Sequence, residues 1–199
     1  MKKPLILGLT GSIGMGKSTA AKIMRQMGLP IYSADKAVHD LLKKDGKAVK
    51  PVARLFPAVL KNGAINRKLL GLEVFSAPSK LRRLEKIIHP LVREAEKKFL
   101  TKHRHAAGVV LEIPLLFETG GEKRCDVVLV VTAPPKIQRT RVLQRPRMTE
   151  QKFKAILKQQ MPDAIKRRRA DMVIHTGKGV SDTKRQLKQF WTQLQKQAK

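Results

Sequence analysis

A glycine-rich stretch near the start of the chain constrains the fold more than any other feature. Residues 11–18 read GSIGMGKS and fit the pattern G-x-x-x-x-G-K-[ST]. An apolar run precedes this stretch, and Ala20, Ile23 and Met24 mark an amphipathic helix after it. Glycines let backbone N–H groups converge on a polyphosphate at the positive end of such a helix. The stretch therefore predicts a loop that binds a nucleoside triphosphate, most simply ATP.

The residues of this loop have separate expected tasks. Lys17 would neutralise β- and γ-phosphate oxygens, and the hydroxyl of Ser18 would bind the Mg²⁺ ion that bridges them. We expect the nucleotide-binding residues to be Gly11, Ser12, Ile13, Gly14, Met15, Gly16, Lys17, Ser18 and Thr19.

Short β-branched runs alternate with longer helical patterns along the chain, which is typical of parallel strands joined by helices. The run DVVLVVTA is apolar at every position from 127 to 131, as in a strand covered on both faces. The sequence predicts an α/β fold of three layers, with a parallel five-stranded sheet flanked by helices. The expected strands are residues 5–9, 30–33, 109–113, 127–132 and 172–175.

Two intervals are too long for simple connections between strands. We interpret the chain of 199 residues as a single domain whose core covers about 1–33, 105–138 and 170–199. A helical insertion would occupy about 34–104, and a basic lid about 139–169. The lid would contain a short helix with Phe153, Ile156 and Leu157, flanked by Arg139, Arg141, Arg145, Arg147, Arg167, Arg168 and Arg169. A C-terminal helix is expected to bury Leu187, Phe190, Trp191 and Leu194.

Acidic residues lie at or just beyond the ends of two of the predicted strands. Ligands of open parallel sheets collect beyond the carboxyl ends of the strands. Asp35 could therefore act there as a base or orient an acceptor hydroxyl, although an aspartate also suits the first turn of a helix. Glu112 could hold Mg²⁺ through water.

The charge of the chain limits its partners. The sequence has 43 Lys and Arg against 15 Asp and Glu, a formal net charge of +28. Such a chain attracts polyanions, but its 4% aromatic content offers few stacking platforms for single-stranded nucleic acid. The single cysteine, Cys125, fits a reducing compartment. We expect a cytoplasmic protein with no membrane segment and no specific nucleic-acid partner, and the oligomeric state stays open.

Five motifs, in order, resemble those of the dephospho-CoA kinase family. They are GLTGSIGMGKST, SADKAVHDLL, IIHPLV, IPLLFE and KQQMPDAIKRRRADMVI, and the third resembles a helix start at His89–Pro90. The resemblance implies a P-loop kinase that moves the γ-phosphate of ATP to the ribose 3′-hydroxyl of dephospho-CoA. The insertion would then bind the acceptor, with ATP and Mg²⁺ as co-substrate and cofactor.

The resemblance also implies roles for single residues. Asp35, Lys17, Arg145 and Arg141 would be catalytic, and arginines that close over a transferring phosphoryl group stabilise its charge. The acceptor would meet Thr10, Asp35, His89 and Glu118, the nucleotide would also meet Thr176 and Gly177, and the metal would meet Ser18 and Glu112. The sequence departs from the family pattern at Ser33, Glu112 and Thr176, where Asp, Asp and Asn are common.

Two alternatives remain open on the sequence alone. The first is another small P-loop kinase, of the shikimate or nucleoside monophosphate type. The second is a basic P-loop protein that binds nucleic acid.

Overall fold

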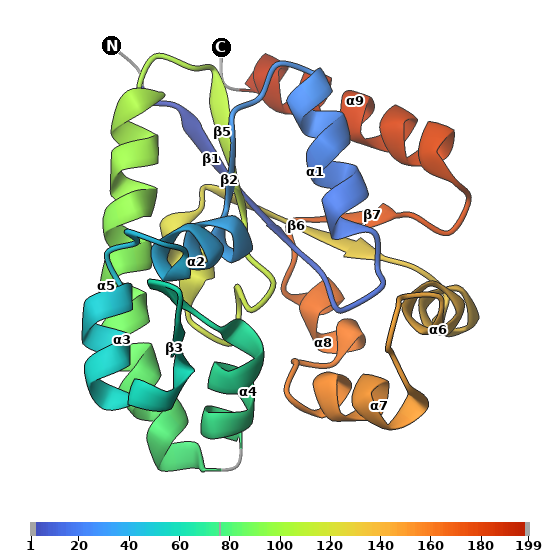
Figure 1. The fold of residues 1–199 in the computed structure, drawn as a ribbon. Coiled ribbons are helices and arrows are strands. Elements are labelled where there is room, and N and C mark those ends of the chain that lie inside the picture. Colours follow the sequence, from blue (N-terminus) through green and yellow to red (C-terminus); the bar gives the residue numbers. More distant parts are fainter. Residues whose placement is uncertain (1–2, 76, 198–199) are drawn as a thin grey trace. The chain divides into compact units, whose positions relative to one another are not determined.

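The central element of the fold is a five-stranded sheet. The structure is a computed structural model that describes residues 3–75 and 77–197. The sheet has the order β2-β5-β1-β6-β7 (Figure 1). Its strands are β1 (Leu5–Thr10), β2 (Ile31–Ser33), β5 (Gly108–Glu112), β6 (Val127–Thr132) and β7 (Met172–His175). β1 pairs in parallel with both β5 and β6, and β6 pairs in parallel with β7. The predicted α/β fold and all five predicted strands are confirmed.

The chain divides into two compact units. The first combines the chain up to Tyr32 with the chain from His103 onward, and the second runs from Ser33 to Lys102. The first unit contains most of the sheet together with the short 3₁₀ helix η2 (Gly121–Arg124) and five helices. These are α1 (Lys17–Gln26), α6 (Pro135–Leu143), α7 (Glu150–Lys158), α8 (Asp163–Arg168) and α9 (Val180–Gln197).

The core of the first unit lies between the sheet and the helices α1 and α9, which pack against each other (Figure 1). Fully buried strand residues such as Leu7 and Leu129 meet Met24 of α1 and Leu187 of α9. The predicted C-terminal stripe lies in this core: Leu187, Phe190 and Trp191 are buried, and Leu194 packs against them. Successive residues of β5 and β6, which point to opposite faces of the sheet, are nearly all buried, and this explains why these strands read as continuous apolar runs.

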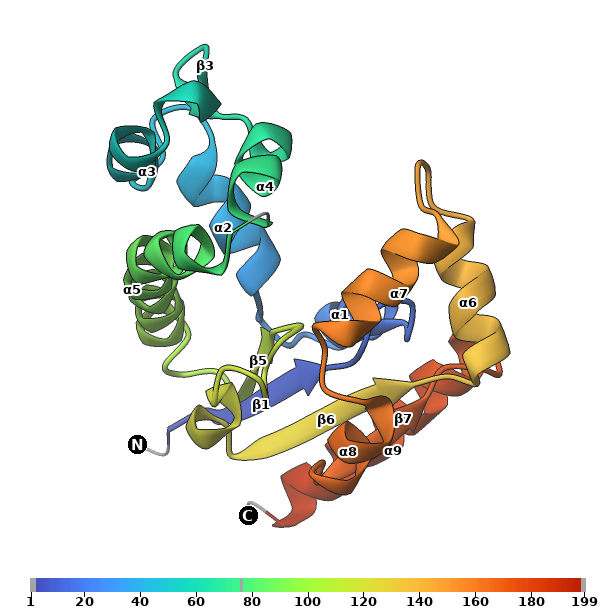
Figure 2. The same cartoon turned by 90° about the horizontal axis from the view of Figure 1, so that it is seen from below.

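The remaining helices of the first unit follow β6. Figure 2 shows α6 and α7 side by side, and the two helices are in contact. Phe153 of α7 is buried. Thr149 caps this helix, because its hydroxyl accepts a hydrogen bond from the backbone N–H of Lys152 at 3.3 Å. The hydroxyl of Thr132, at the end of β6, donates to the Asp163 carboxylate in the first turn of α8 at 2.9 Å.

The second unit is mainly helical and has a core of its own. Its elements are α2 (Ala34–Leu42), α3 (Val49–Leu55), η1 (Pro57–Val59), β3 (Leu60–Lys61), β4 (Ala64–Ile65), α4 (Arg67–Phe75) and α5 (Pro78–Lys102). Buried Val52, Phe56, Leu70 and Ile88 belong to this core. On its surface Glu94 meets Lys47 and Lys98, and their hydrogen bonds lower the pKa of Glu94 to about 2.

A small hairpin in the second unit was not predicted from the sequence. β3 and β4 pair antiparallel, and the turn between them is Asn62-Gly63, with φ angles of 51° and 76°. Asn-Gly is the preferred pair for a two-residue hairpin turn with positive φ at both positions. The signal was present, but the strands of two residues each are too short to show an alternating pattern.

The predicted helix start at His89–Pro90 is wrong. Pro90 lies inside α5, which begins at Pro78. An apolar stripe continues through the proline, from Leu84 to Ile88 and Leu91, and packs into the core of the second unit. Burial of this stripe offsets the roughly 3 kcal/mol that a proline costs inside a helix.

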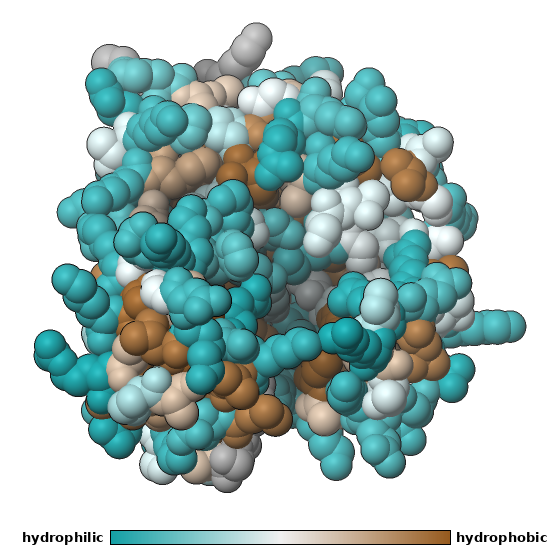
Figure 3. All heavy atoms as spheres, in the orientation of Figure 1, coloured by the Kyte–Doolittle hydropathy of each residue, from teal (hydrophilic) through white to brown (hydrophobic). Residues whose placement is uncertain are grey.

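One face of the molecule can be described by its hydropathy. Figure 3 shows one face covered mostly by hydrophilic side chains, with smaller hydrophobic patches between them. Among the residues that the structure describes, no helix is both long and apolar enough to span a membrane.

Candidate phosphate-transfer site

The glycine-rich loop connects β1 to α1, as the motif predicted. Gly14 and Gly16 have φ angles of 79° and 88°, a conformation that side chains disfavour. A Cβ atom on Gly14 would also lie 2.9 Å from the carbonyl oxygen of Gln138, and one on Gly16 would lie 2.9 Å from Thr176 Oγ1. These two positions therefore require glycine because α6 and the segment after β7 approach the loop closely.

Lys17 and Glu112 form an ion pair beside the loop. Lys17 is the first residue of α1, and Glu112 ends β5, the strand that pairs with β1. Lys17 Nζ donates to Glu112 Oε1 at 2.8 Å, and the two side chains are only 13% and 10% exposed. The structure brings these two predicted site residues together, and it places a largely buried cation where the motif requires one.

The hydroxyl-bearing residues after Lys17 remain accessible. Ser18 and Thr19 lie in the first turn of α1 and are exposed. A serine hydroxyl is the type of oxygen ligand that Mg²⁺ accepts. Within residues 3–75 and 77–197, no group of three or more His, Cys, Asp and Glu side chains could hold a metal ion.

Arg141 contacts the segment after β7. Its guanidinium donates to Thr176 Oγ1 at 2.9 Å and to the Thr176 carbonyl oxygen at 2.7 Å. The hydroxyl of Thr176 in turn donates to the carbonyl oxygen of Met15 in the loop at 2.9 Å. Three predicted site residues are thus joined, and Arg141 links α6 to the glycine-rich loop through Thr176. A Cβ atom on the neighbouring Gly177 would lie 2.8 Å from Pro134 Cδ.

The other arginines of the predicted lid differ in their surroundings. Arg145 follows α6 and is exposed. Other arginines form ion pairs with acidic side chains, which leaves less of their charge available to a ligand. These pairs are Arg139 with Glu150, Arg167 with Asp163, and Arg169 with Glu122.

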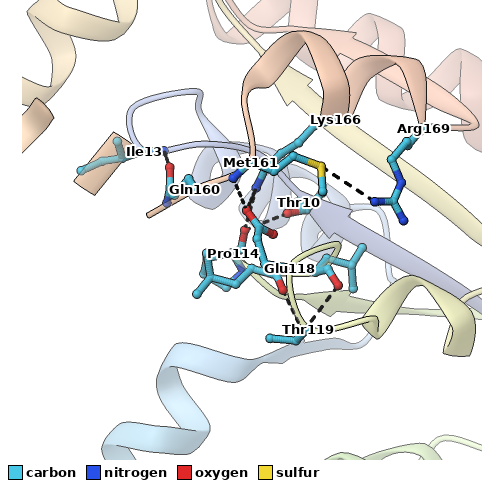
Figure 4. A network of polar contacts seen from close by, with 11 residues as sticks. Thr10, Ile13, Pro114, Glu118, Thr119, Gln160, Met161, Lys166 and Arg169 are labelled. Atoms are coloured by element: carbon cyan, nitrogen blue, oxygen red, sulfur yellow. Dashed lines mark hydrogen bonds and ion pairs between the residues drawn. The ribbon is translucent and has the colours of Figure 1, made fainter. Parts of the chain in front are cut away.

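Glu118 belongs to a network of polar contacts. Its carboxylate forms an ion pair with Lys166 at 2.9 Å and accepts a hydrogen bond from the backbone N–H of Met161 at 2.7 Å (Figure 4). Lys166 is fully buried and also donates to the Pro114 carbonyl oxygen at 3.2 Å. The predicted site residue Thr10 is buried too, and its hydroxyl donates to the same carbonyl at 3.0 Å.

Three residues beside the glycine-rich loop and Glu118 were not predicted from the sequence. They are Gln138, Gln160 and Lys166. Gln138 Nε2 donates to the Ile13 carbonyl oxygen at 2.7 Å, and Gln160 Oε1 accepts from the Ile13 N–H at 3.0 Å. Gln160 and Lys166 both lie in the family motif KQQMPDAIKRRRADMVI, and this motif could have indicated them. The amino-acid composition could not show that Lys166 is buried while many other lysines are exposed.

Two predicted site residues lie in the second unit. Asp35 is the second residue of α2 and is exposed, and the helix is capped by the Ser33 hydroxyl, which accepts from the Lys36 N–H at 3.5 Å. Asp35 is therefore not needed as the cap of its helix. His89 is exposed on α5.

Comparisons with known proteins agree with these features. The family model described as dephospho-CoA kinase matches residues 5–182. The dephospho-CoA kinase of Paramagnetospirillum magneticum is 57% identical over 164 residues, which cover 81% of this chain and 77% of that protein. The dephospho-CoA kinase of Rhizobium meliloti is 50% identical over 186 residues, 92% of this chain and 95% of that protein.

A solved structure is similar to nearly the whole chain. A crystal structure from Thermus thermophilus has a TM-score of 0.86 and 36% identity, and it covers 97% of this chain and 99% of that chain. The family match, the curated relatives and the glycine-rich loop thus point in the same direction. This chain belongs to the dephospho-CoA kinase family.

Proposed function

We propose that this protein transfers the γ-phosphoryl group of ATP to the ribose 3′-hydroxyl of dephospho-CoA in the cytoplasm. The products are coenzyme A and ADP, and the reaction completes coenzyme A biosynthesis. The observation that carries the proposal is the glycine-rich loop with Lys17 and Glu112 beside it, in a chain of this family.

Lys17 changes partner in this mechanism. In the structure its ammonium group is paired with Glu112. A triphosphate in the loop offers the ammonium group several oxygens that carry more negative charge than one carboxylate. Lys17 then neutralises β- and γ-phosphate oxygens, and backbone N–H groups of the loop bind the same phosphates.

Ser18 and Glu112 are the residues that fit Mg²⁺. The exposed Ser18 hydroxyl would hold the ion, and the Glu112 carboxylate, which is paired with Lys17 in the structure, would assist in holding it. When bound, Mg²⁺ neutralises charge that develops on the phosphate oxygens.

The acceptor side of the reaction depends on Asp35. Its carboxylate accepts the proton of the 3′-hydroxyl as the oxygen attacks phosphorus, and ADP leaves from the opposite side. His89 and Thr10 contact the acceptor. Arg145 and Arg141 stabilise the charge on the transferring group. Glu118 also contacts the acceptor, and its carboxylate holds the segment between α7 and α8 through the N–H of Met161.

Thr176 and Gly177 complete the nucleotide site. Their segment lies against the loop through the bond from Thr176 to Met15, so the base of the nucleotide meets the same structural unit as its phosphates. This arrangement makes the nucleotide position dependent on the link between Arg141 and Thr176.

An assay of ADP release with a panel of acceptors tests the proposal. Dephospho-CoA, shikimate, AMP and adenosine are each supplied with ATP and Mg²⁺. The proposal predicts fast release with dephospho-CoA alone, because its pantetheine arm supplies binding energy that aligns the hydroxyl. Faster release with shikimate or AMP would instead identify another small P-loop kinase.

A further inference from the structure

Two glutamines hold the same residue of the glycine-rich loop from two different segments. Gln138 of α6 donates to the Ile13 carbonyl oxygen at 2.7 Å, and Gln160, between α7 and α8, accepts from the Ile13 N–H at 3.0 Å. Gln138 is buried. Figure 4 shows the Gln160 amide directed at the Ile13 nitrogen. One donor and one acceptor therefore fix the peptide groups on both sides of Ile13.

The position of Ile13 in the loop gives these bonds a consequence for phosphate binding. Ile13 directly precedes Gly14, whose positive φ angle turns the chain back toward α1. The N–H groups that must converge on phosphate follow this turn. A rotation of the peptide group at Ile13 would redirect them, because glycine offers little resistance. Donors that are oriented before the ligand arrives need no reorganisation when it binds.

The segment that carries Gln160 is itself held by a buried ion pair. The N–H of the next residue, Met161, donates to Glu118, and Glu118 pairs with the fully buried Lys166. Lys166 and Thr10 both donate to the Pro114 carbonyl oxygen. This network, drawn in Figure 4, leads from Gln160 back to the end of β1. The position of Gln160 thus depends on buried contacts of the first unit.

We propose that Gln160 is a positioning residue for phosphoryl transfer. Its amide oxygen sets the orientation of the Ser12–Ile13 peptide group, and Gln138 holds the next one. Together they set, through Gly14, the direction of the N–H groups that bind phosphate. Gln160 acts through the loop and does not need to touch the reacting atoms. The consequence for turnover rests on the proposed function, but the effect on the loop and on nucleotide affinity does not.

Three variants of the full chain test this proposal. Gln160→Met keeps the length of the side chain and removes the acceptor. Gln160→Glu keeps an acceptor oxygen. Gln159→Met is the matched control, because the adjacent Gln159 is exposed and caps α7 through its backbone only.

The first measurement is amide hydrogen exchange at Ile13 by NMR, without any ligand. Loss of one hydrogen bond should accelerate exchange at Ile13 about fivefold in Gln160→Met, while amides of the central sheet exchange as before. Gln160→Glu should restore the protection of Ile13, and Gln159→Met should match the wild type.

The second measurement is the affinity for ADP with Mg²⁺ by calorimetry. We expect Gln160→Met to bind about fivefold more weakly. KM for ATP should rise by a similar factor, with KM for dephospho-CoA unchanged. If Gln160 had a purely structural role, its substitution would lower Tm without this selective loss of nucleotide affinity.

The proposal is overturned if Gln160→Met and Gln159→Met exchange at Ile13 equally fast, if Gln160→Glu fails to restore protection, or if both methionine variants bind ADP equally well. These results do not depend on the acceptor. Absence of coenzyme A formation by the wild type would contradict the proposed function instead, and would leave the exchange and affinity results to decide the role of Gln160.

Discussion

Lys17 is the residue on which phosphate binding depends most directly. We predict that Lys17→Met lowers kcat/KM at least about 10²-fold, because a charged donor to the transferring group is lost. Lys17→Arg should keep the pairing with Glu112 and the fold but still lose activity, because a guanidinium fork does not reproduce a compact ammonium charge. Steady-state kinetics and circular dichroism measure the two effects.

The control for Lys17 is Lys22→Met, on the exposed side of the same helix. It should leave turnover unchanged. Near-normal turnover by a folded Lys17→Met variant would remove the basis for assigning the loop to phosphate binding.

Asp35 has either a chemical role, as the base for the acceptor hydroxyl, or only a local structural role at the start of α2. We predict that Asp35→Asn lowers kcat by about 10²-fold to 10⁴-fold with ATP affinity unchanged, because an amide cannot accept the hydroxyl proton. The cap of α2 is the Ser33 hydroxyl, so the variant should keep its helix. Kinetics at saturating concentrations of both substrates provide the measurement.

Asp40→Asn is the matched control for Asp35. Asp40 lies on the same helix, and hydrogen bonds from Lys36 and Lys43 lower the pKa of its carboxyl group. This variant should keep full kcat. If Asp35→Asn also keeps full kcat and loses only up to ~1 kcal/mol of stability, the only role of Asp35 is to stabilise the N-terminus of α2.

The pair of Lys166 and Glu118 is one of the contacts that attach the helix α8 to the rest of its unit, beside the bond from Thr132 to Asp163. We predict that Glu118→Leu destabilises the protein by about 3–5 kcal/mol, because it leaves a buried cation without its partner. The double variant with Lys166→Met should recover most of this loss. Denaturant unfolding of both single variants and the double variant measures the coupling.

Glu94→Gln is the control for the buried pair. Glu94 also meets two lysines, but all three side chains are exposed at the surface. Its substitution should cost far less stability than Glu118→Leu. If the two variants are equally stable, or if the double variant is no more stable than Glu118→Leu, the buried pair does not anchor α8.

Some helices and strands could be predicted from neighbouring residues in the sequence, and others could not. All five sheet strands were predictable from short apolar and β-branched runs, and the signal is strongest in β5 and β6, which are buried at nearly every position. The loop was predictable because its glycines and Lys17 are neighbours in sequence. The hairpin β3–β4 has a local turn signal, but its strands are too short to show an alternating pattern. The signal at Pro90 indicated a helix start, whereas the course of α5 through the proline depends on packing within the second unit.

Only the parts of the site that are formed by residues adjacent in sequence could be predicted. The pairing of Lys17 with Glu112 joins residues 95 positions apart, and the bond from Ile13 to Gln160 spans 147 positions. Such contacts follow from strand order and helix packing. The family resemblance named Glu118, but only the structure shows that its carboxylate meets Lys166.

The whole molecule carries a formal net charge of +28, which predicts a salt-dependent attraction to polyanions. We expect any DNA or RNA binding to be non-specific and to weaken steeply as salt rises, because it depends on counterion release. Fluorescence anisotropy with unrelated oligonucleotides over a salt series measures this dependence. A preference for one sequence that persists at physiological salt would contradict the expectation.

The most direct test of the account is the identity of the product formed from ATP and dephospho-CoA. Mass spectrometry detects the added phosphoryl group, and ³¹P NMR locates it on the product. The account predicts stoichiometric ADP and a phosphate on the ribose 3′-oxygen, formed by the wild type and lost in Asp35→Asn. A phosphate at any other position, or no transfer to dephospho-CoA by the folded wild type, would contradict it.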